Sequence, residues 1–199
     1  MKILIVGAYG TIGKKVTEEF SKRHEIITAG RKSGAISVDI ESSESISDMF
    51  KQTGKIDACI VAAGSAFYGD FTTLTEENIY AGIKSKLMGQ VNVILIGQNY
   101  INDNGSITIT TGILSEDPVK NYSAISLVNG ALNSFVMAAS RELKRGIRIN
   151  AVCPGLVEDS TEEIGYKFPG HIPVSMKRVV SAYVKSVEGF NTGEILRVY

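Results

Sequence analysis

Apolar runs and amphipathic stretches alternate along the whole chain. The first run, Lys2–Val6, is continuous and rich in β-branched residues, which is typical of a strand buried on both faces of a parallel sheet. It ends in the turn Gly7–Gly13, and a helical pattern follows at once over Lys14–Phe20. The chain therefore begins with a strand, a glycine-rich turn and a helix, in that order.

Further strands and helices are predicted to alternate to the end of the chain. The strands are short apolar runs at Glu25–Ala29, Ala35–Val38, Asp57–Val61, Ser106–Thr110, Ile147–Val152 and Glu194–Val198. The helices are predicted at Glu41–Gln52, Glu76–Asn102 (one extended helix or two joined ones), Asn121–Arg145 and Ser175–Val187. This alternation predicts an α/β fold: a single doubly wound parallel sheet of the Rossmann type, with helices on both faces and one domain over residues 1–199.

Length, charge and cysteine content narrow the class of protein. The chain has 199 residues, and Lys+Arg and Asp+Glu balance at 21 each, so charge gives no indication of a nucleic-acid or membrane partner. Its apolar stretches look far shorter than the roughly 20 residues that span a bilayer, and Lys2–Val6 reads as part of the fold, not as a signal peptide. Cys59 and Cys153 lie in apolar runs and are expected to be buried thiols. Two histidines give no indication of a metal site. We expect a cytoplasmic protein.

The turn after the first strand has the chemistry of a phosphate site. Gly7, Gly10 and Gly13 have the spacing G-x-x-G-x-x-G, with Ala8, Tyr9, Thr11 and Ile12 between them. Glycines permit a tight turn and let the backbone approach a pyrophosphate. The free N–H groups and the positive end of the helix dipole then meet the anion. We expect a dinucleotide to bind here, although a plain strand-to-helix turn is the alternative.

In a doubly wound sheet, ligands bind beyond the carboxyl ends of the strands. The candidate site residues are those that directly follow each predicted strand: Gly7–Gly13, Arg31, Asp39, Ala62–Gly64, Thr110–Thr111 and Pro154–Gly155.

Several of these stretches resemble short-chain dehydrogenases/reductases, in order and over nearly the whole chain. The glycine turn is similar to the cofactor motif of that family. Arg148–Gly155 resembles its R-x-N-x-x-x-P-G segment, which is the most specific match, and Thr192–Leu196 resembles its closing T-G-x-x-L strand. The resemblance is to a compact bacterial-type member of the family.

The resemblance implies further cofactor-binding positions. Asp39, with Ile40 beside it, matches the acidic residue that contacts the adenine ring. Ala62, Ala63 and Gly64 match the Asn-Asn-Ala-Gly segment, with its asparagines lost. Near the nicotinamide, the implied residues are Pro154, Gly155 and Val157.

The catalytic positions depart from the family pattern. The family carries a tyrosine and, four residues later on the same helix face, a lysine. An ordinary tyrosine titrates near 10, and a lysine cation favours its phenolate. Here Tyr122 matches the tyrosine, but Ser126 stands four residues later. Thr110 or Thr111 matches the catalytic serine, and Lys86 matches the family's asparagine in the preceding long helix.

Two interpretations of this departure stay open. In one, catalysis has decayed, Tyr122 is an exposed first-turn residue and Lys86 is a solvated helix lysine. In the other, the lysine has moved, and Lys86 supplies the missing positive charge near Tyr122 or the nicotinamide ribose.

The turn after the second strand bears on cofactor choice. NAD sites usually place a carboxylate there, whereas arginine accommodates a 2′-phosphate. The chain has Gly30-Arg31-Lys32-Ser33 at this point, so we expect NADP, with NADPH preferred over NADH. The alternative is that Arg31 stacks on adenine or forms a surface ion pair.

The sequence thus predicts an NADP-dependent oxidoreductase that transfers a hydride to or from a small carbonyl or alcohol. The alternatives are a catalytically silent NADP-binding sensor or scaffold, and an isomerase or epimerase on the same fold. A short lid is expected within Val157–Val187, with no role assigned to Tyr166, Phe168 or His171. The resemblance further implies a homodimer or homotetramer built on the two long helices.

Overall fold

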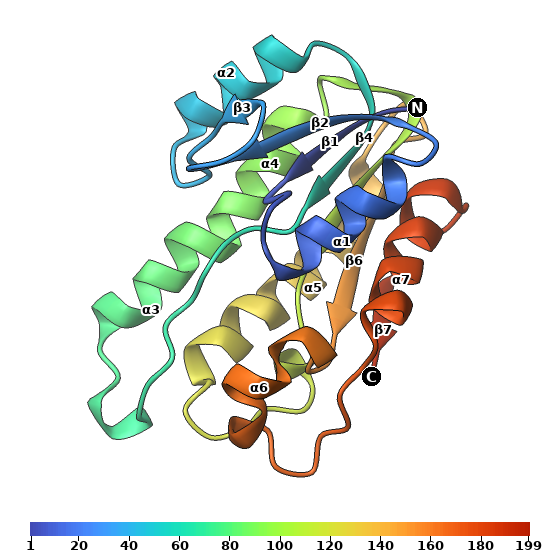
Figure 1. Cartoon of the computed structure of the whole chain (residues 1–199). Helices are drawn as coiled ribbons and strands as arrows, with labels where there is room; N and C mark the ends of the chain where they lie inside the picture. Colours follow the sequence, from blue (N-terminus) through green and yellow to red (C-terminus); the bar gives the residue numbers. More distant parts are fainter.

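A sheet of seven parallel strands forms the centre of the computed structural model, which describes all 199 residues (Figure 1). The strands are β1 (Lys2–Val6), β2 (Glu25–Gly30), β3 (Ile36–Ser37), β4 (Ile56–Val61), β5 (Ile101–Thr110), β6 (Arg148–Pro154) and β7 (Ile195–Val198). Their order in the sheet is β3-β2-β1-β4-β5-β6-β7. The chain winds outward in one direction from β1 and in the other from β4, which confirms the predicted Rossmann fold.

Helices cover both faces of this sheet. They are α1 (Thr11–Phe20), α2 (Ser43–Thr53), α3 (Glu76–Gly82), α4 (Gly89–Gly97), α5 (Ser123–Glu142), α6 (Thr161–Ile164) and α7 (Met176–Glu188). Helices α1 and α7 lie side by side on one face, and α2, α4 and α5 lie on the other (Figure 1).

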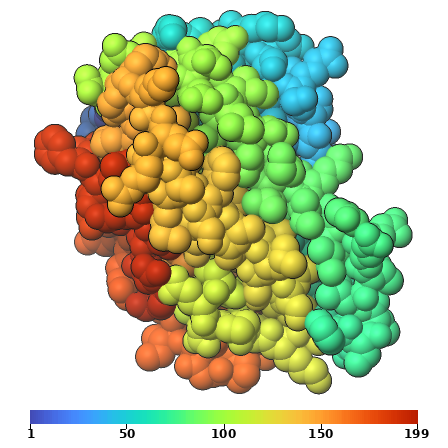
Figure 2. Space-filling model, turned by 180° about the vertical axis from the view of Figure 1, so that it is seen from behind, coloured from blue at the N-terminus to red at the C-terminus, as the bar shows by residue number.

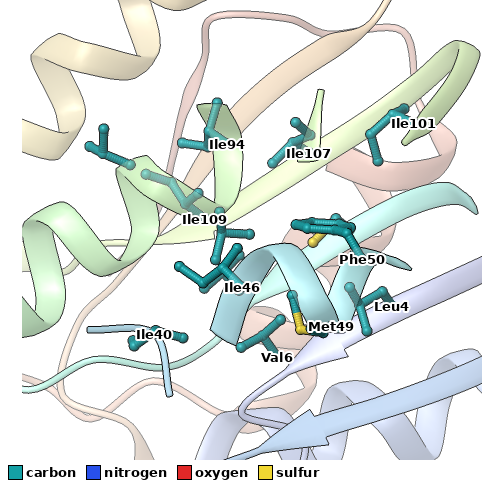
Figure 3. Close-up of a cluster of buried hydrophobic side chains, with 14 of the residues drawn as sticks. Leu4, Val6, Ile40, Ile46, Met49, Phe50, Ile94, Ile101, Ile107 and Ile109 are labelled. Carbon is teal, nitrogen blue, oxygen red and sulfur yellow. The ribbon is translucent and has the colours of Figure 1, made fainter. Parts of the chain in front are cut away.

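The alternation of side chains along the strands divides the core into two layers. In β1, Ile3 and Ile5 belong to the cluster under α1 and α7, whereas Leu4 and Val6 belong to the larger cluster under α2, α4 and α5. Figure 3 shows this second cluster, in which Ile46, Met49 and Phe50 of α2 lie among the strand side chains. The i, i+3, i+4 pattern of these three residues is thus the buried face of α2, as predicted.

The stretch from Glu76 is a joined helix that ends earlier than expected. Residues Ile83–Met88 form a turn of π-helix (η2) between α3 and α4, and the helix ends at Gly97. Strand β5 begins at Ile101, five residues before the predicted start, and the register of its pairing with β4 shifts between Ile56 and Ala58. Most of the early residues of β5 are polar, so their pattern does not predict a strand.

Helix α5 corrects one expectation from composition. Its 20 residues are long and apolar enough to cross a bilayer by length and composition alone, with a mean hydropathy of 1.2. In this structure Ala124, Val128, Leu132 and Val136 form the buried stripe of α5, and a third of the apolar window is buried. The helix therefore packs as part of the layered fold.

Candidate active site and cofactor site

The glycine turn places three backbone groups in close contact at the end of β1. Gly7 has a φ of +84°, a left-handed conformation that favours glycine. A Cβ at Gly7 would run into the carbonyl of Ala62, and a Cβ at Gly13 would run into the carbonyl of Gly7. Only glycine therefore lets α1 approach β1 and β4 at this point.

The N-terminus of α1 is open to a ligand. Gly10 is the N-cap and supplies no side-chain cap, so the first N–H groups of α1 have no partner within the helix. Thr11 is exposed, Ile12 is half-buried and Tyr9 is exposed, whereas Ala8 is buried beneath the turn. This cradle of backbone donors at a helix N-terminus fits a pyrophosphate.

A first cavity, of about 380 Å³, lies between the glycine turn and the ends of β2 and β3. It brings together Gly7, Arg31, Ile40, Ala63 and Gly64, which are all predicted cofactor residues. Six lining residues were not among the predicted cofactor residues: Val6, Gly30, Lys32, Val38, Ser65 and Ser85. The cavity has an apolar floor and a basic rim, which suits the adenosine half of a dinucleotide.

Charges at the rim of this cavity are partly paired. Arg31 is exposed, and its guanidinium donates to the carboxylates of Asp39 (3.3 Å) and Glu41 (3.2 Å). Asp39 itself does not line the cavity. Lys32 lies beside Arg31 at the rim. One cation is thus held by two acids, and the next residue adds a second positive charge at the same rim.

A second cavity, of about 180 Å³, is lined by residues that follow β5 and β6 and by residues of the lid segment that contains α6. Figure 1 shows α6 near the carboxyl end of β6. Six predicted site residues line the cavity: Ile12, Lys86, Thr111, Pro154, Gly155 and Val157. The lid side of the cavity is lined by Leu156, Ser160, Ile164 and Phe168. Phe168, to which the sequence analysis assigned no role, is therefore part of the site. Ile12 of the glycine turn lines this cavity and Gly7 lines the first, so the turn lies between the two cavities.

The two threonines after β5 have different environments. The Thr110 hydroxyl donates to the carbonyl of Val61 (2.7 Å) and lies 2.6 Å from the phenol oxygen of Tyr183. Gln90 of α4 holds the Thr110 backbone through two hydrogen bonds, of 2.9 and 3.0 Å. Thr111 lines the second cavity, and its buried hydroxyl has no hydrogen-bond partner within the protein. Of the two candidates, only Thr111 lines the second cavity.

Tyr122 lies outside the wall of this cavity. It is only 6% exposed, which corrects the interpretation of an exposed first-turn residue. Its ring packs between Tyr68 (4.6 Å between ring centroids) and Phe168 (5.3 Å), and burial raises the pKa of its phenol. Tyr122 packs against Phe168, which lines the cavity, but is not itself part of the cavity wall.

A different pair of α5 residues faces the cavity. Ile125 and Asn129, four residues apart, line it, whereas Tyr122 and Ser126 do not. Three residues along a helix turn the facing direction by about 60°. The predicted pair, three residues earlier, consequently points beside the cavity. The Oδ1 atom of Asn129 is buried without a hydrogen-bond partner.

Lys86 supplies the charge in this cavity. It belongs to the π-helical turn η2, and its Nζ donates to the carbonyl of Thr111 at 3.4 Å. Gly64 packs so closely on Lys86 that a Cβ there would lie 2.8 Å from the Lys86 Cα. Burial lowers the pKa of the Lys86 ammonium to about 8. Lys86 is thus not a solvated helix lysine.

Comparison with known proteins agrees with this geometry. A family model described as enoyl-(acyl carrier protein) reductase matches residues 11–178. The chain belongs to the short-chain dehydrogenase/reductase family. Among curated relatives of this short-chain dehydrogenase/reductase, the uncharacterized oxidoreductase YmfI of Bacillus subtilis is 26% identical, over 98% of this chain and 96% of that protein.

Solved structures extend the comparison. The protein lin1944 from Listeria innocua is 46% identical and superposes with a TM-score of 0.99, with both chains fully covered. A small-chain dehydrogenase in complex with NADPH is 25% identical, with a TM-score of 0.88 over all of this chain and 96% of that chain. The recognised family, its oxidoreductase class and its nicotinamide-cofactor fold are therefore those predicted from the sequence.

Proposed function

We propose that this short-chain dehydrogenase/reductase is an NADPH-dependent reductase of small carbonyl compounds. The observation that carries the proposal is the arrangement of the two cavities on either side of the glycine turn. The first has backbone donors and the cations Arg31 and Lys32 for a phosphorylated adenosine. The second has the Thr111 hydroxyl and the Lys86 ammonium for a carbonyl oxygen.

The residues fit the cofactor group by group. Gly7–Gly13 would hold the pyrophosphate, Arg31 and Lys32 the 2′-phosphate, and Ile40, Ala63 and Gly64 the adenosine. Pro154, Gly155 and Val157 would flank the nicotinamide. When bound, the reduced nicotinamide supplies a hydride. The chain itself excludes water with the apolar lid and offers donors to the oxygen atom that gains negative charge.

A catalytically silent NADP-binding protein is the second candidate. The loss of the family's lysine favours it, because Ser126 stands four residues after Tyr122 and neither residue lines the second cavity. In that case the ligand would be sensed, or held as a scaffold, without turnover.

A cofactor titration followed by a turnover assay tests both candidates. We expect saturable quenching of protein fluorescence by NADPH, weaker binding of NADH, and oxidation of NADPH with some of a panel of small aldehydes and ketones. The variant Arg31→Ala should weaken NADPH binding about tenfold or more and leave NADH binding unchanged, since a charge-assisted contact contributes about 1.5–3 kcal/mol. Binding without turnover on any carbonyl would favour the silent protein, and equal affinity for the two cofactors would contradict the NADPH preference.

We also propose that the protein is a homodimer or homotetramer in the cytoplasm. Helices α4 and α5 run side by side over the face seen in Figure 2. They expose Leu95, Leu127 and Met137, each about half accessible. A second copy covering these side chains would remove apolar surface from water. Light scattering during size-exclusion chromatography measures the mass, and a monomer at micromolar concentration would contradict this part of the proposal.

A further inference from the structure

One chemical fact singles out the second cavity. Fifteen residues line it, and Lys86 is the single one among them whose side chain gains or loses a proton near neutral pH. The others are apolar or carry only amide and hydroxyl groups. A reaction in this cavity that needs a proton from a side chain therefore has one source.

The Lys86 ammonium makes fewer hydrogen bonds than its three N–H donors allow. An ammonium has three N–H donors, and the one recorded partner of Nζ is the Thr111 carbonyl, at 3.4 Å. Burial favours the neutral amine, so a ligand oxygen that accepts a hydrogen bond or a proton from Nζ would relieve an unfavourable state.

The groups around Lys86 include no charged side chain that would stabilise its ammonium form. Gly64 and Ser65 approach from the loop after β4, Thr111 and Gly112 from the loop after β5, and Ile125 and Asn129 from α5. On β6, the Cys153 thiol is the titratable neighbour of Lys86. Burial raises the pKa of the Cys153 thiol, so it is neutral at pH 8. A buried carboxylate that would pin the ammonium in its charged form does not line this cavity.

We propose that Lys86 is the proton donor of this site and replaces the tyrosine phenol that serves in the family. The inference rests on the proposed function. As the carbonyl carbon receives the hydride, the π electron pair of the C=O bond moves to oxygen, and this oxygen takes a proton from Nζ. The carbonyl is reduced to an alcohol, with the reduced nicotinamide as the reductant. Lys86 is left as a neutral amine and regains its proton from water.

Thr111 completes the donor set. Its unpartnered hydroxyl borders the same cavity and can donate to the carbonyl oxygen before the proton moves. Asn129, with a free buried Oδ1, can accept a hydrogen bond from the Lys86 ammonium and so orient it. Asn129 is thus a positioning residue.

The first test measures Lys86 directly and needs no substrate. The lysines of the purified protein are converted to ¹³C-dimethyl-lysines, and each methyl signal is followed by NMR against pH. We expect one signal to titrate near pH 8, to vanish in Lys86→Met and to remain in Lys185→Met, an exposed lysine on α7. Titration of the Lys86 signal together with the surface lysines would overturn the proposal.

The second test separates charge from proton donation. Lys86→Arg keeps a cation that holds its proton at neutral pH, and Lys86→Met keeps the length without charge. With the aldehyde and ketone panel, we expect turnover to fall about 100-fold or more in both variants, with NADPH affinity kept within about tenfold. Wild-type kcat should fall as pH rises through about 8, because the donor must be protonated.

Failure of the inference differs from failure of the proposed function. Near-normal turnover in Lys86→Arg, or an unchanged alkaline limb, would overturn the role of Lys86 while the protein remains a reductase. Absence of NADPH binding or of any turnover in the wild type would overturn the proposed function, and the inference with it.

Discussion

The Thr110 hydroxyl lies 2.6 Å from the phenol oxygen of Tyr183, across the face of the sheet that α7 covers. Tyr183 is fully buried, and burial raises the pKa of its phenol. Thr110 also donates to the carbonyl of Val61, so one hydroxyl ties β5 to both β4 and α7. The adjacent Thr111 lines the second cavity, and its hydroxyl is buried without a hydrogen-bond partner.

The two threonines should respond oppositely to loss of the hydroxyl. Thr110→Val leaves buried partners unsatisfied, and we expect it to lower the free energy of unfolding by about 1–3 kcal/mol. Thr111→Val removes an unpartnered hydroxyl, and we expect a change within about 0.5 kcal/mol. Turnover should instead fall about tenfold or more in Thr111→Val, since it removes a donor to the substrate oxygen. Urea unfolding and initial rates measure the two effects. A stable Thr110→Val and an unstable Thr111→Val would contradict this assignment.

Tyr122 provides a test of which side chain gives the proton. Tyr122→Phe keeps the ring between Tyr68 and Phe168 and removes a hydroxyl that does not reach the cavity. We therefore expect turnover and NADPH affinity to stay within about twofold, as for other changes away from a site. Tyr122→Ala would instead destabilise the fold by about 3–5 kcal/mol, as large-to-small aromatic changes do. A drop of 100-fold or more in kcat for Tyr122→Phe would return the donor role to the phenol.

Substitution of Gly13 tests the close packing of the glycine turn against α1. In Gly13→Ala the new Cβ would meet the backbone of Gly7, which cannot move aside as a flexible side chain could. We expect a loss of about 1–3 kcal/mol in the free energy of unfolding, together with much weaker NADPH binding. Gly130 of α5 is the matched control, because nothing lies within 4 Å of a Cβ there. Gly130→Ala should stabilise the protein by about 0.5–1 kcal/mol through helix propensity. Equal effects of the two variants would mean that the turn has room for a Cβ at Gly13.

Asp57 gives the stability of the fold a dependence on pH. Its carboxylate accepts hydrogen bonds from the Asn102 side chain and the Lys2 backbone N–H, each 2.7 Å long, and these bonds lower its pKa. A carboxyl whose folded-state pKa is depressed stabilises the protein above its unfolded pKa, near 4. That contribution is lost as pH falls through the lower, folded value. We expect Asp57→Asn to cost about 1–3 kcal/mol at pH 7 and progressively less below pH 4, measured by urea unfolding at several pH values.

Asp48 is the control for this prediction. It lies on α2 in an exposed ion pair with Lys51, and exposed pairs contribute about 0–1 kcal/mol. Asp48→Asn should therefore change stability little at pH 7. If Asp57→Asn lowered the free energy of unfolding by the same amount from pH 7 to pH 3, the two hydrogen bonds would not be stabilising the charged form of Asp57.

Much of the fold was predictable because its signals are local. Buried parallel strands read as apolar runs, and the i, i+3, i+4 pattern of Ile46, Met49 and Phe50 marks the covered face of α2. The helix start at Thr75 is also local. The Thr75 hydroxyl accepts from the Asn78 backbone N–H, and the Asn78 Oδ1 accepts from the Thr75 backbone N–H, although asparagine is an unusual partner in that motif. The early part of β5 was missed because its polar residues carry no strand pattern. Only Ile101 pairs with β4 before the pairing resumes at Ser106, and Asn104 between them has a φ of +62°.

The orientation of α5 relative to the second cavity was not predictable from local patterns. Tyr122 and Ser126 match the expected positions by count along the chain, but the side chains that face the cavity are Ile125 and Asn129. Tyr122 is only the N-cap of α5, and Ser123 begins the helix. Residues three apart on a helix differ in facing direction by about 60°, so Ile125 and Asn129 line the cavity whereas Tyr122 and Ser126 do not. The buried stripe Ala124, Val128, Leu132, Val136 indicates the true orientation once the sheet is known.

The sequence by itself determined the doubly wound fold, the oxidoreductase family and the glycine turn, because each depends on residue types at fixed short spacings. Only the tertiary structure decided which side chains meet in the second cavity. Lys86 and Thr111 are 25 residues apart and Lys86 and Asn129 lie on different helices, so their meeting follows from how α4 and α5 pack on the sheet. The π-helical turn that contains Lys86 and the packing of Gly64 on it bring the ammonium to the cavity, and burial among those elements lowers its pKa.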